Sequence, residues 1–326
     1  MLTAVRTAAA LLAATLTAAV IAPATALAQA YPAKTVRLVL PFAAGSAVDA
    51  LGRYYAQRMA ENWKQQVVVD NRTGANGIIG TEIAARSPAD GYTLYLGNVA
   101  TLAINPHLYA KLPYDVPRDF APVSLIAVIN NCLVVHPSLP VRSVRDLLAL
   151  AKARPGQLNY ASGGVGSAQH IPMEMLKSMT GANIVHVAYK GLTPAFNDVV
   201  AGQVPMMVSG LVTALPLHRA GRLRILALTG DKRSSAVPEV PTMAEAGVAG
   251  YDFDSWTGML APADTPADIV ARLNGELVRI TRQPETHERL PGFEWVGGSP
   301  QAFADHIRKS SDRIGKVVRD AGIKAE

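Results

Sequence analysis

The sequence predicts an α/β protein built from two similar lobes. Apolar, β-branched runs alternate with helix-patterned stretches along the chain, which indicates βαβ units and mainly parallel sheets with helices on both faces. Both halves open with a strand, a turn of small residues and a helix: PFAAGSAVDALGR in the first and NYASGGVGSAQHIPMEML in the second. The length of 326 residues accommodates about two domains of roughly 100–200 residues each.

The elements of the first half follow from its apolar runs. Strands are expected at 36–40, 66–70, 92–97, 125–129 and 132–137, and helices at 48–62, 77–86 and 143–153. After Pro155-Gly156 a second set begins, with strands at 158–162, 183–189, 204–209 and 223–228. Helices around 168–180, 193–202 and 213–220 separate them.

The C-terminal segment returns to the first lobe. We expect a strand at 253–262, a helix capped at Thr265-Pro266 and a last helix over 300–320 after Ser299-Pro300. These helices would cover the first lobe, so the chain crosses between lobes near 130 and near 253. The predicted domains are lobe 1 at 31–131 and 253–326, and lobe 2 at 132–252. A two-stranded hinge with a ligand cleft follows.

The first thirty residues have the layout of a secretory signal peptide. Arg6 precedes an Ala/Leu/Val/Ile run that ends in overlapping small-x-small sites, with cleavage expected after Ala28 or Ala30. The alternative is a retained membrane anchor, which needs about 20 apolar residues. No later stretch is long and apolar enough to span a membrane, so we expect a soluble, monomeric mature chain in the periplasm.

Charge and composition exclude several classes of function. Without Arg6, 30 basic and 25 acidic side chains remain, with no Lys/Arg-rich run or interleaved aromatic set of the kind that binds nucleic acid. The seven histidines form no HxxxH pair, and no Walker loop, G-x-S-x-G elbow or complete G-x-G-x-x-G fingerprint occurs. We therefore expect no metal and no cofactor. Cys132 is the only cysteine and lies in a predicted buried strand.

The two small-residue turns are the candidate binding site. Each lies between a strand and a helix N-terminus, which exposes unpaired N–H donors and the positive end of the peptide dipoles. The turn residues are almost all Ala, Gly or Ser, so a ligand can approach the backbone. Neither turn holds an Arg or Lys, which favours a carboxylate over a phosphate. The alternative is that both are structural βα turns.

The chain resembles the periplasmic solute-binding receptors of tripartite tricarboxylate transporters, the Bug or TctC family. Eight collinear blocks across the mature chain carry the resemblance, including YPAKTVRLVLPFAAGSAVD (31–49), VVVDNRTGANGIIG (67–80), LNYASGGVGSAQH (158–170), HVAYKG (186–191) and WTGMLAPADTP (256–266). The resemblance implies a two-lobed periplasmic-binding-protein fold, similar to type II, that closes like a Venus flytrap. It also implies no catalysis, and capture of a small organic carboxylate for a membrane permease.

The resemblance also implies which residues bind the ligand, largely through backbone amides and bridging waters. In the first turn these are Phe42, Ala43, Ala44, Gly45, Ser46 and Asp49. In the second turn they are Ser162, Gly163, Gly166, Ser167 and His170. Tyr189, Lys190 and Trp256 are expected to border the cleft. Asp49 could instead favour the helix dipole, His170 could pack or cap, and Tyr189 and Trp256 could be core aromatics.

Three departures from the family pattern concern specificity. Ser46 stands where the family usually has Gly, which adds a hydroxyl and narrows the pocket. Pro205 and Ser209 replace two acids in VPMMVS (204–209). An acid facing the cleft would pair with an amino group, so the loss at Ser209 argues against an amino-acid ligand. Ala188 replaces Pro in HVAYKG, with only local backbone consequences expected.

Two other functions remain open. A serine hydrolase on the same scaffold could use Ser162 or Ser167 with His170, although no oriented acid partner is evident in the sequence. A sensor could keep the binding fold and present its ligand to a membrane histidine kinase, because docking surfaces carry no readable motif.

Overall fold

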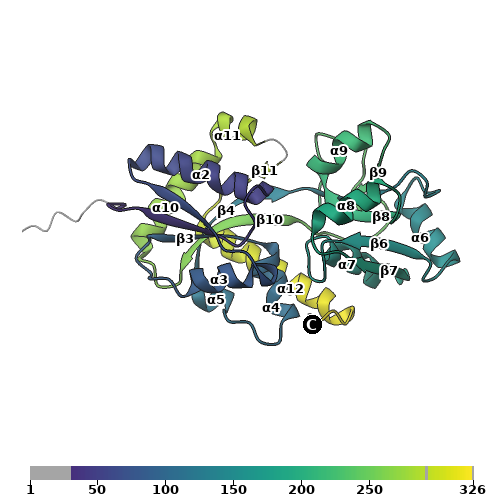
Figure 1. Cartoon of the computed structure of the whole chain (residues 1–326), viewed down its shortest axis with the longest axis horizontal. Helices are drawn as coiled ribbons and strands as arrows, with labels where there is room; N and C mark the ends of the chain where they lie inside the picture. The colour runs from purple at the N-terminus through teal and green to yellow at the C-terminus, as the bar shows by residue number, and fades with distance from the viewer. Residues whose placement is uncertain (1–30, 291–292, 325–326) are drawn as a thin grey trace, which may run out of the picture. The chain divides into compact units, whose positions relative to one another are not determined.

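The computed structural model describes residues 31–290 and 293–324. The predicted signal peptide, residues 1–30, lies outside the described residues. All the helices and strands of the described residues belong to one compact unit, Lys34–Glu326. Two separate β-sheets form in this unit, and Figure 1 shows them with their helices.

The first sheet is assembled from both ends of this unit. Its strand order is β11-β4-β10-β3-β1-β2. β1 pairs in parallel with β2 and β3, whereas β10 runs antiparallel to β3 and β4. The bounds are β1 (Val36–Leu40), β2 (Val67–Asn71), β3 (Thr93–Asn98), β4 (Phe120–Ile129), β10 (Ser255–Pro262) and β11 (Glu294–Trp295). The C-terminal part of the chain therefore completes a sheet that the N-terminal part begins.

The second sheet uses only the middle of the chain. Its order is β7-β6-β8-β5-β9. β6 pairs in parallel with β7 and β8, and β5 is antiparallel to β8 and β9. The bounds are β5 (Asn131–Val135), β6 (Leu158–Ser162), β7 (Ile184–Ala188), β8 (Met206–Gly210) and β9 (Arg224–Leu228). Each sheet is mixed, with antiparallel strands next to the crossings.

The chain passes between the sheets twice, and hydrogen bonds join the two crossings. The first crossing is Asn130, between β4 and β5, and the second directly precedes β10. The side-chain amide of Asn131 donates to Ser255 Oγ at 2.7 Å. The Asn131 carbonyl accepts from the Thr229 N–H at 2.9 Å, and Thr229 in turn accepts from the Phe253 N–H at 2.8 Å. Hydrogen bonds therefore hold the two crossing segments of the hinge together.

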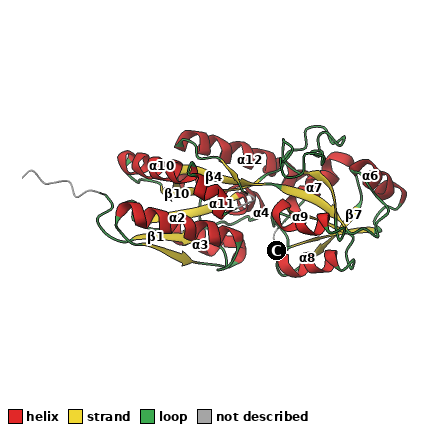
Figure 2. Ribbon diagram, turned by 90° about the horizontal axis from the view of Figure 1, so that it is seen from above, coloured by secondary structure: helices red, strands yellow, loops and turns green. Residues whose placement is uncertain are grey.

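Helices flank the strands of each sheet (Figure 2). Their bounds are α2 (Ala47–Trp63), α3 (Ile78–Ala85), α4 (Asn105–Leu108), α5 (Val116–Asp119), α6 (Val144–Ala153), α7 (His170–Thr180), α8 (Leu192–Val200), α9 (Leu211–Arg219), α10 (Ala267–Thr281), α11 (Pro284–Arg289) and α12 (Pro300–Asp320). A 3-10 turn (Ala75–Gly77) precedes α3 and a π-helical turn (Ala100–Ile104) precedes α4. α12 packs on β4 and also contacts α7, which belongs to the second sheet.

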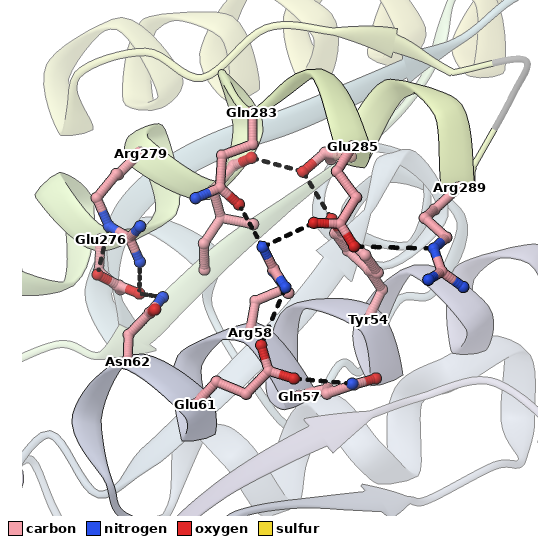
Figure 3. Close-up of polar contacts among 12 residues, drawn as sticks. Tyr54, Gln57, Arg58, Glu61, Asn62, Glu276, Arg279, Gln283, Glu285 and Arg289 are labelled. Carbon is pink, nitrogen blue, oxygen red and sulfur yellow. Dashed lines mark hydrogen bonds and ion pairs between the residues drawn. The ribbon is translucent and has the colours of Figure 1, made fainter.

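A polar network fixes α2 against α10 and α11 (Figure 3). Arg58 is its centre, because its guanidinium bonds Glu61 on α2, Gln283 beyond α10 and Glu285 on α11. Beneath it, Tyr55 is fully buried and its hydroxyl lies 2.7 Å from Thr281 Oγ1. These contacts hold α2, and therefore its N-terminus, at a fixed place on the sheet.

Most predicted elements are confirmed, including the strands at 36–40 and 158–162 and the helix at 300–320 with its Ser299 cap. Cys132 is buried in β5, as expected. The predicted cap at Thr265 is wrong: Pro266 caps α10 without a side-chain bond, and the Thr265 hydroxyl donates to the Pro262 carbonyl instead. α4, α5, α11 and β11 were not predicted, because they are short and carry little periodic signal.

Candidate functional site

The first predicted turn leads from β1 into α2. Ser46 is the N-cap of α2, and its Oγ accepts from the Asp49 N–H at 3.1 Å. Ala43, Ala44 and Gly45 are exposed, and Gly45 has a φ of +82°, a left-handed conformation that glycine adopts without strain. Within the described part of the chain, no acceptor faces the N–H groups of Ala43 and Ala44. The turn therefore presents free donors at a helix N-terminus.

The carboxylate of Asp49 holds the shape of this turn through hydrogen bonds. Its side chain is buried, Oδ2 accepts from the Gly45 N–H and from Arg53 Nε, both at 2.9 Å, and Oδ1 accepts from Asn71 at 2.8 Å. Burial acts to raise the pKa of Asp49, but the bonds from Arg53, Gly45 and Asn71 outweigh it and hold the pKa below its usual value. Asn71 also donates to the Phe42 carbonyl. Both oxygens of the carboxylate are used within the turn.

The second predicted turn, between β6 and α7, is tied by its own side chains. Ser162 is fully buried, and its Oγ accepts from the Gly164 N–H at 3.1 Å. Ser167 Oγ accepts from the His170 N–H, and the Gly166 N–H donates to His170 Nδ1 at 3.1 Å. The N–H groups of Gly163 and Val165 have no acceptor among the described residues. Three N–H donors, those of Gly164, Gly166 and His170, thus hold the shape of this turn, and the two without an acceptor are left for a ligand.

A stack of three rings supports the second turn. The rings of His170 and His186 lie 4.1 Å apart, and Tyr160 stacks on His186 at 4.8 Å. Ser162 Oγ lies 2.6 Å from His186 Nε2. The predicted hydrolase pairing of Ser162 with His170 is therefore absent from this arrangement, since His186 occupies that place. Ser162, having no exposed surface, is poorly placed to attack a substrate.

Burial disfavours the charged form of both histidines of the stack. Removal from water is the main cause that lowers the pKa of His170 to about 4, and the neighbouring His186 lowers it further. Burial likewise lowers the pKa of His186. Glu174, below the stack, accepts from the Tyr160 hydroxyl at 2.5 Å and from Lys177 at 2.6 Å. A neutral His170 is required, because only an unprotonated Nδ1 accepts the Gly166 N–H.

The segment 74–77 lies beside both turns. A β carbon on Gly77 would lie 3.3 Å from Pro41 Cβ, at the start of the first turn. A β carbon on Gly166 would lie 3.7 Å from Asn76 Nδ2 and would overlap the Leu108 side chain. Gly166 belongs to the second sheet's lobe, whereas Asn76 and Leu108 belong to the first. The two lobes therefore meet at the second turn.

The remaining predicted residues lie at different depths. The Tyr189 hydroxyl donates to Asp198 at 2.6 Å, which raises the pKa of Tyr189 to about 12, and Lys190 beside it is exposed. Ser209 is buried near the end of β8, and Cys132 Sγ contacts its carbonyl at 3.5 Å. Trp256 is buried, and its indole Nε1 donates to Ser310 on α12 at 3.1 Å.

Two large cavities lie away from these residues. One, of about 620 Å³, is formed by α4, α5, β4 and α12 and includes Tyr109, Phe120 and Ile307. The other, of about 670 Å³, lies along α9 and is also lined by Asn130, Arg233 and Phe293. None of the predicted binding residues lines either cavity. Among the described residues, no group of three or more His, Cys, Asp or Glu side chains is arranged to hold a metal ion.

Two residues that brace the turns, Asn71 and His186, were not among the predicted site residues. Sheet register explains their positions: β1 and β2 align Leu40 with Asn71, and β6 and β7 align Tyr160 with His186. The available signal was that Asn71 ends a strand and that His186 lies within one, in lobes whose parallel pairing was expected.

Residues 51–323 match the family model of the tripartite tricarboxylate transporter family receptor, TctC. The chain belongs to this family. The match begins just after the first predicted turn and covers the second. The family is one of substrate-binding receptors, as the sequence resemblance indicated.

Individual relatives align with this chain over nearly their whole lengths. Protein BugT of Bordetella pertussis is 35% identical over 94% of this chain and 95% of its own. The solved structure of R. palustris Rpa4515 with adipate is 40% identical, with a TM-score of 0.81 over 90% of this chain and 99% of that one. MatC from Rhodopseudomonas palustris with bound malate is 30% identical, with a TM-score of 0.77 over 88% and 100%. The predicted two-lobed fold class is confirmed.

No helix among the described residues combines the length and the apolar character needed to cross a membrane.

Proposed function

We propose that this protein is a periplasmic receptor that captures a small organic carboxylate between its two lobes and delivers it to a tripartite transporter permease. The observation that supports this most is the pair of turns with free N–H donors, one on each lobe, in a chain similar to receptors solved with adipate and with malate. The predicted binding residues and domain boundaries are part of this proposal, and so is the absence of enzymatic activity.

The energetics require both turns and closure of the lobes. One helix terminus contributes up to about 2 kcal/mol in a partly buried site, whereas micromolar affinity corresponds to about 8 kcal/mol. Hydrogen bonds from the free amides and from Ser46 and Ser167, strengthened as water is excluded, would supply the difference. The bond from Gly45 to Asp49 fixes the first turn before the ligand arrives, which lowers the entropic cost of binding.

Thermal unfolding against a ligand panel tests the proposal. A carboxylate present at about 100 times its Kd is expected to stabilise the native state by about 2.7 kcal/mol. Adipate, malate, succinate and nicotinate form the test set, and nucleotides and amino acids form the control set. A raised midpoint with one or more acids, and none with the controls, is the expected outcome. Stabilisation by nucleotides alone would refute the proposal.

The hydrolase alternative has its own measurement. Incubation with chromogenic esters should release no chromophore, because Ser162 is buried and paired with His186. If the wild type releases chromophore and Ser162→Ala abolishes that release, hydrolysis is favoured over the proposed receptor function.

A further inference from the structure

A cavity of about 670 Å³ lies beside the first crossing of the hinge. Asn130, the crossing itself, is part of its lining, and both lobes contribute to it. The second lobe supplies α9 and the segment after β9, whereas the first lobe supplies Phe293 and Glu294, where the chain enters β11. The volume falls within the range of about 300–1,000 Å³ that is typical of pockets for small molecules.

The order of the strands separates this cavity from the two turns of the proposed carboxylate site. In the first sheet, β11 forms one edge, and β1, which leads into the first turn, lies next to the opposite edge. In the second sheet, β9 forms one edge, and β6, which leads into the second turn, lies next to the opposite edge. The cavity is lined from the β9 and β11 edges, so it is a different place from the turns.

Apolar side chains make up part of the lining. Val212, Leu215 and Pro216 recur along α9 at the spacing of one helix face, and all three line the cavity. Val212 is 47% exposed, which is unusual for a large apolar side chain. Phe293 adds an aromatic ring from the first lobe. Apolar surface of this kind is stabilised when an apolar molecule covers it.

Positive charge makes up another part of the lining. Arg219 at the end of α9, and Lys232 and Arg233 after β9, are set against a single carboxylate, that of Glu294. Among the described residues, nothing bonds the Lys232 ammonium group, and the Arg219 guanidinium makes only a 3.5 Å bond to the Ala236 carbonyl. Two cations of the cavity therefore lack a carboxylate partner.

The segment after β9 also offers neutral donors. Ser234 and Ser235 line the cavity beside Arg233. Within residues 31–290 and 293–324, no acceptor faces the backbone N–H groups of these three residues. Cations and N–H donors beside an apolar surface match a ligand that has one anionic group and an apolar body.

The other large cavity has the opposite balance of charge. Its lining includes Asp115 and Asp312 but only one cation, Arg308. Arg308 is already paired with Asp305 at 2.8 Å. Size and apolar character alone therefore do not distinguish the two cavities, whereas charge does.

We propose that the cavity beside Asn130 is a second binding site, which holds a small organic anion in contact with both lobes. Arg219 and Lys232 bind its anionic group, and Val212 and Phe293 contact its apolar body. The proposal goes beyond the proposed function, because it uses none of the residues of the carboxylate site between the turns.

Fluorescence titration with anilinonaphthalene sulfonate tests this site, since the dye joins an anionic group to an apolar body. The double variant Arg219→Gln, Lys232→Gln is expected to raise its Kd about tenfold, because charge-assisted bonds are lost. The neutral dye N-phenylnaphthylamine, which lacks the sulfonate, should bind this variant with a Kd within twofold of the wild type. A double variant that binds the sulfonate as tightly as the wild type would overturn the proposal.

Two further variants test the place of binding. Arg308→Gln, Lys309→Gln is the matched control, because it removes the same charges from exposed positions on α12 and should leave the Kd of the sulfonate within twofold. An equal loss in this control would show non-specific attraction to a basic surface and would contradict the proposal. Phe293→Ala should weaken both dyes several-fold, and an unchanged Kd would rule out contact with the first lobe.

Titration of the sulfonate dye in the presence of adipate distinguishes the cavity from the proposed carboxylate site. The dye is expected to bind at saturating adipate, with a Kd that levels off as adipate rises. A Kd that rises in proportion to adipate without levelling off indicates one shared site and counts against the proposal. If neither adipate nor another acid of the panel binds, the proposed function fails, while the double variant still decides the role of the cavity.

Discussion

At the scale of residues, neutral histidine rings support the second turn. His170 accepts the Gly166 N–H through Nδ1 and stacks on His186, whose Nε2 lies beside Ser162. Protonation of either ring would place a positive charge in a buried stack and, at His170, would convert the acceptor into a donor. The shape of the turn therefore depends on a pH above the titration of these rings.

We predict that acid weakens the fold partly through His170. The unfolded chain binds this proton below about pH 6.5, but the folded chain does so only near pH 4. Stability from this group is therefore complete above pH 6.5 and falls by about 2–3 kcal/mol as the pH drops towards 4. His170→Asn keeps an acceptor for Gly166 without titrating. Urea unfolding at pH 7 and pH 4.5 should show a smaller loss in this variant than in the wild type; equal losses would disprove the prediction.

At the scale of elements, α2 is positioned by α10 and α11 rather than by its own sequence. Its N-terminus forms the first turn, while its last turns hold the Arg58 network and the buried Tyr55–Thr281 bond. The C-terminal helices thus fix a turn that lies more than two hundred residues earlier in the chain.

We predict that Arg58→Ala lowers the free energy of unfolding by about 1 kcal/mol, because Arg58 is mostly buried and bonds three partners. Arg86→Ala is the matched control: Arg86 is 72% exposed and has one ion pair with Glu82, so a loss of at most about 0.5 kcal/mol is expected. Guanidinium titrations of both variants measure the difference. Indistinguishable losses would show that the network contributes no more than an isolated surface pair.

At the scale of the whole described unit, the second turn is where one lobe meets the other. Gly166 has a φ of +74° and lies against Leu108 of the first lobe. Gly181, at the end of α7, has a similar φ of +70° but no atom within 4 Å of its β-carbon position. Substitutions at these two glycines therefore share the free-energy cost of a left-handed backbone, but only a substitution at Gly166 adds a contact between the lobes.

We predict that Gly166→Ala impairs carboxylate binding more than Gly181→Ala does. Both substitutions place alanine in a left-handed conformation, which costs about 1–2 kcal/mol, but only the first also inserts a methyl group between the lobes. Calorimetric Kd values for adipate, and unfolding midpoints, compare the two. Leu108→Ala in the Gly166→Ala background should recover part of the loss; without recovery, contact with Leu108 is not the cause.

The local pattern of the chain determined most of its secondary structure and the two turns. Alternating apolar runs specify strands and helices through their periodicity, and Ser46 and Ser299 mark helix starts through capping chemistry. The mostly small residues of 42–46 and 162–167 mark turns at the ends of strands. Motifs in the sequence also carried the family, which the match over residues 51–323 confirms.

Only the tertiary structure decided which distant residues brace those turns. Asn71 reaches Asp49, and His186 reaches Ser162, because strands far apart in sequence pair in one register. Periodicity is a local property of the chain, whereas burial, charge and hydrogen-bond partners arise when distant segments pack together.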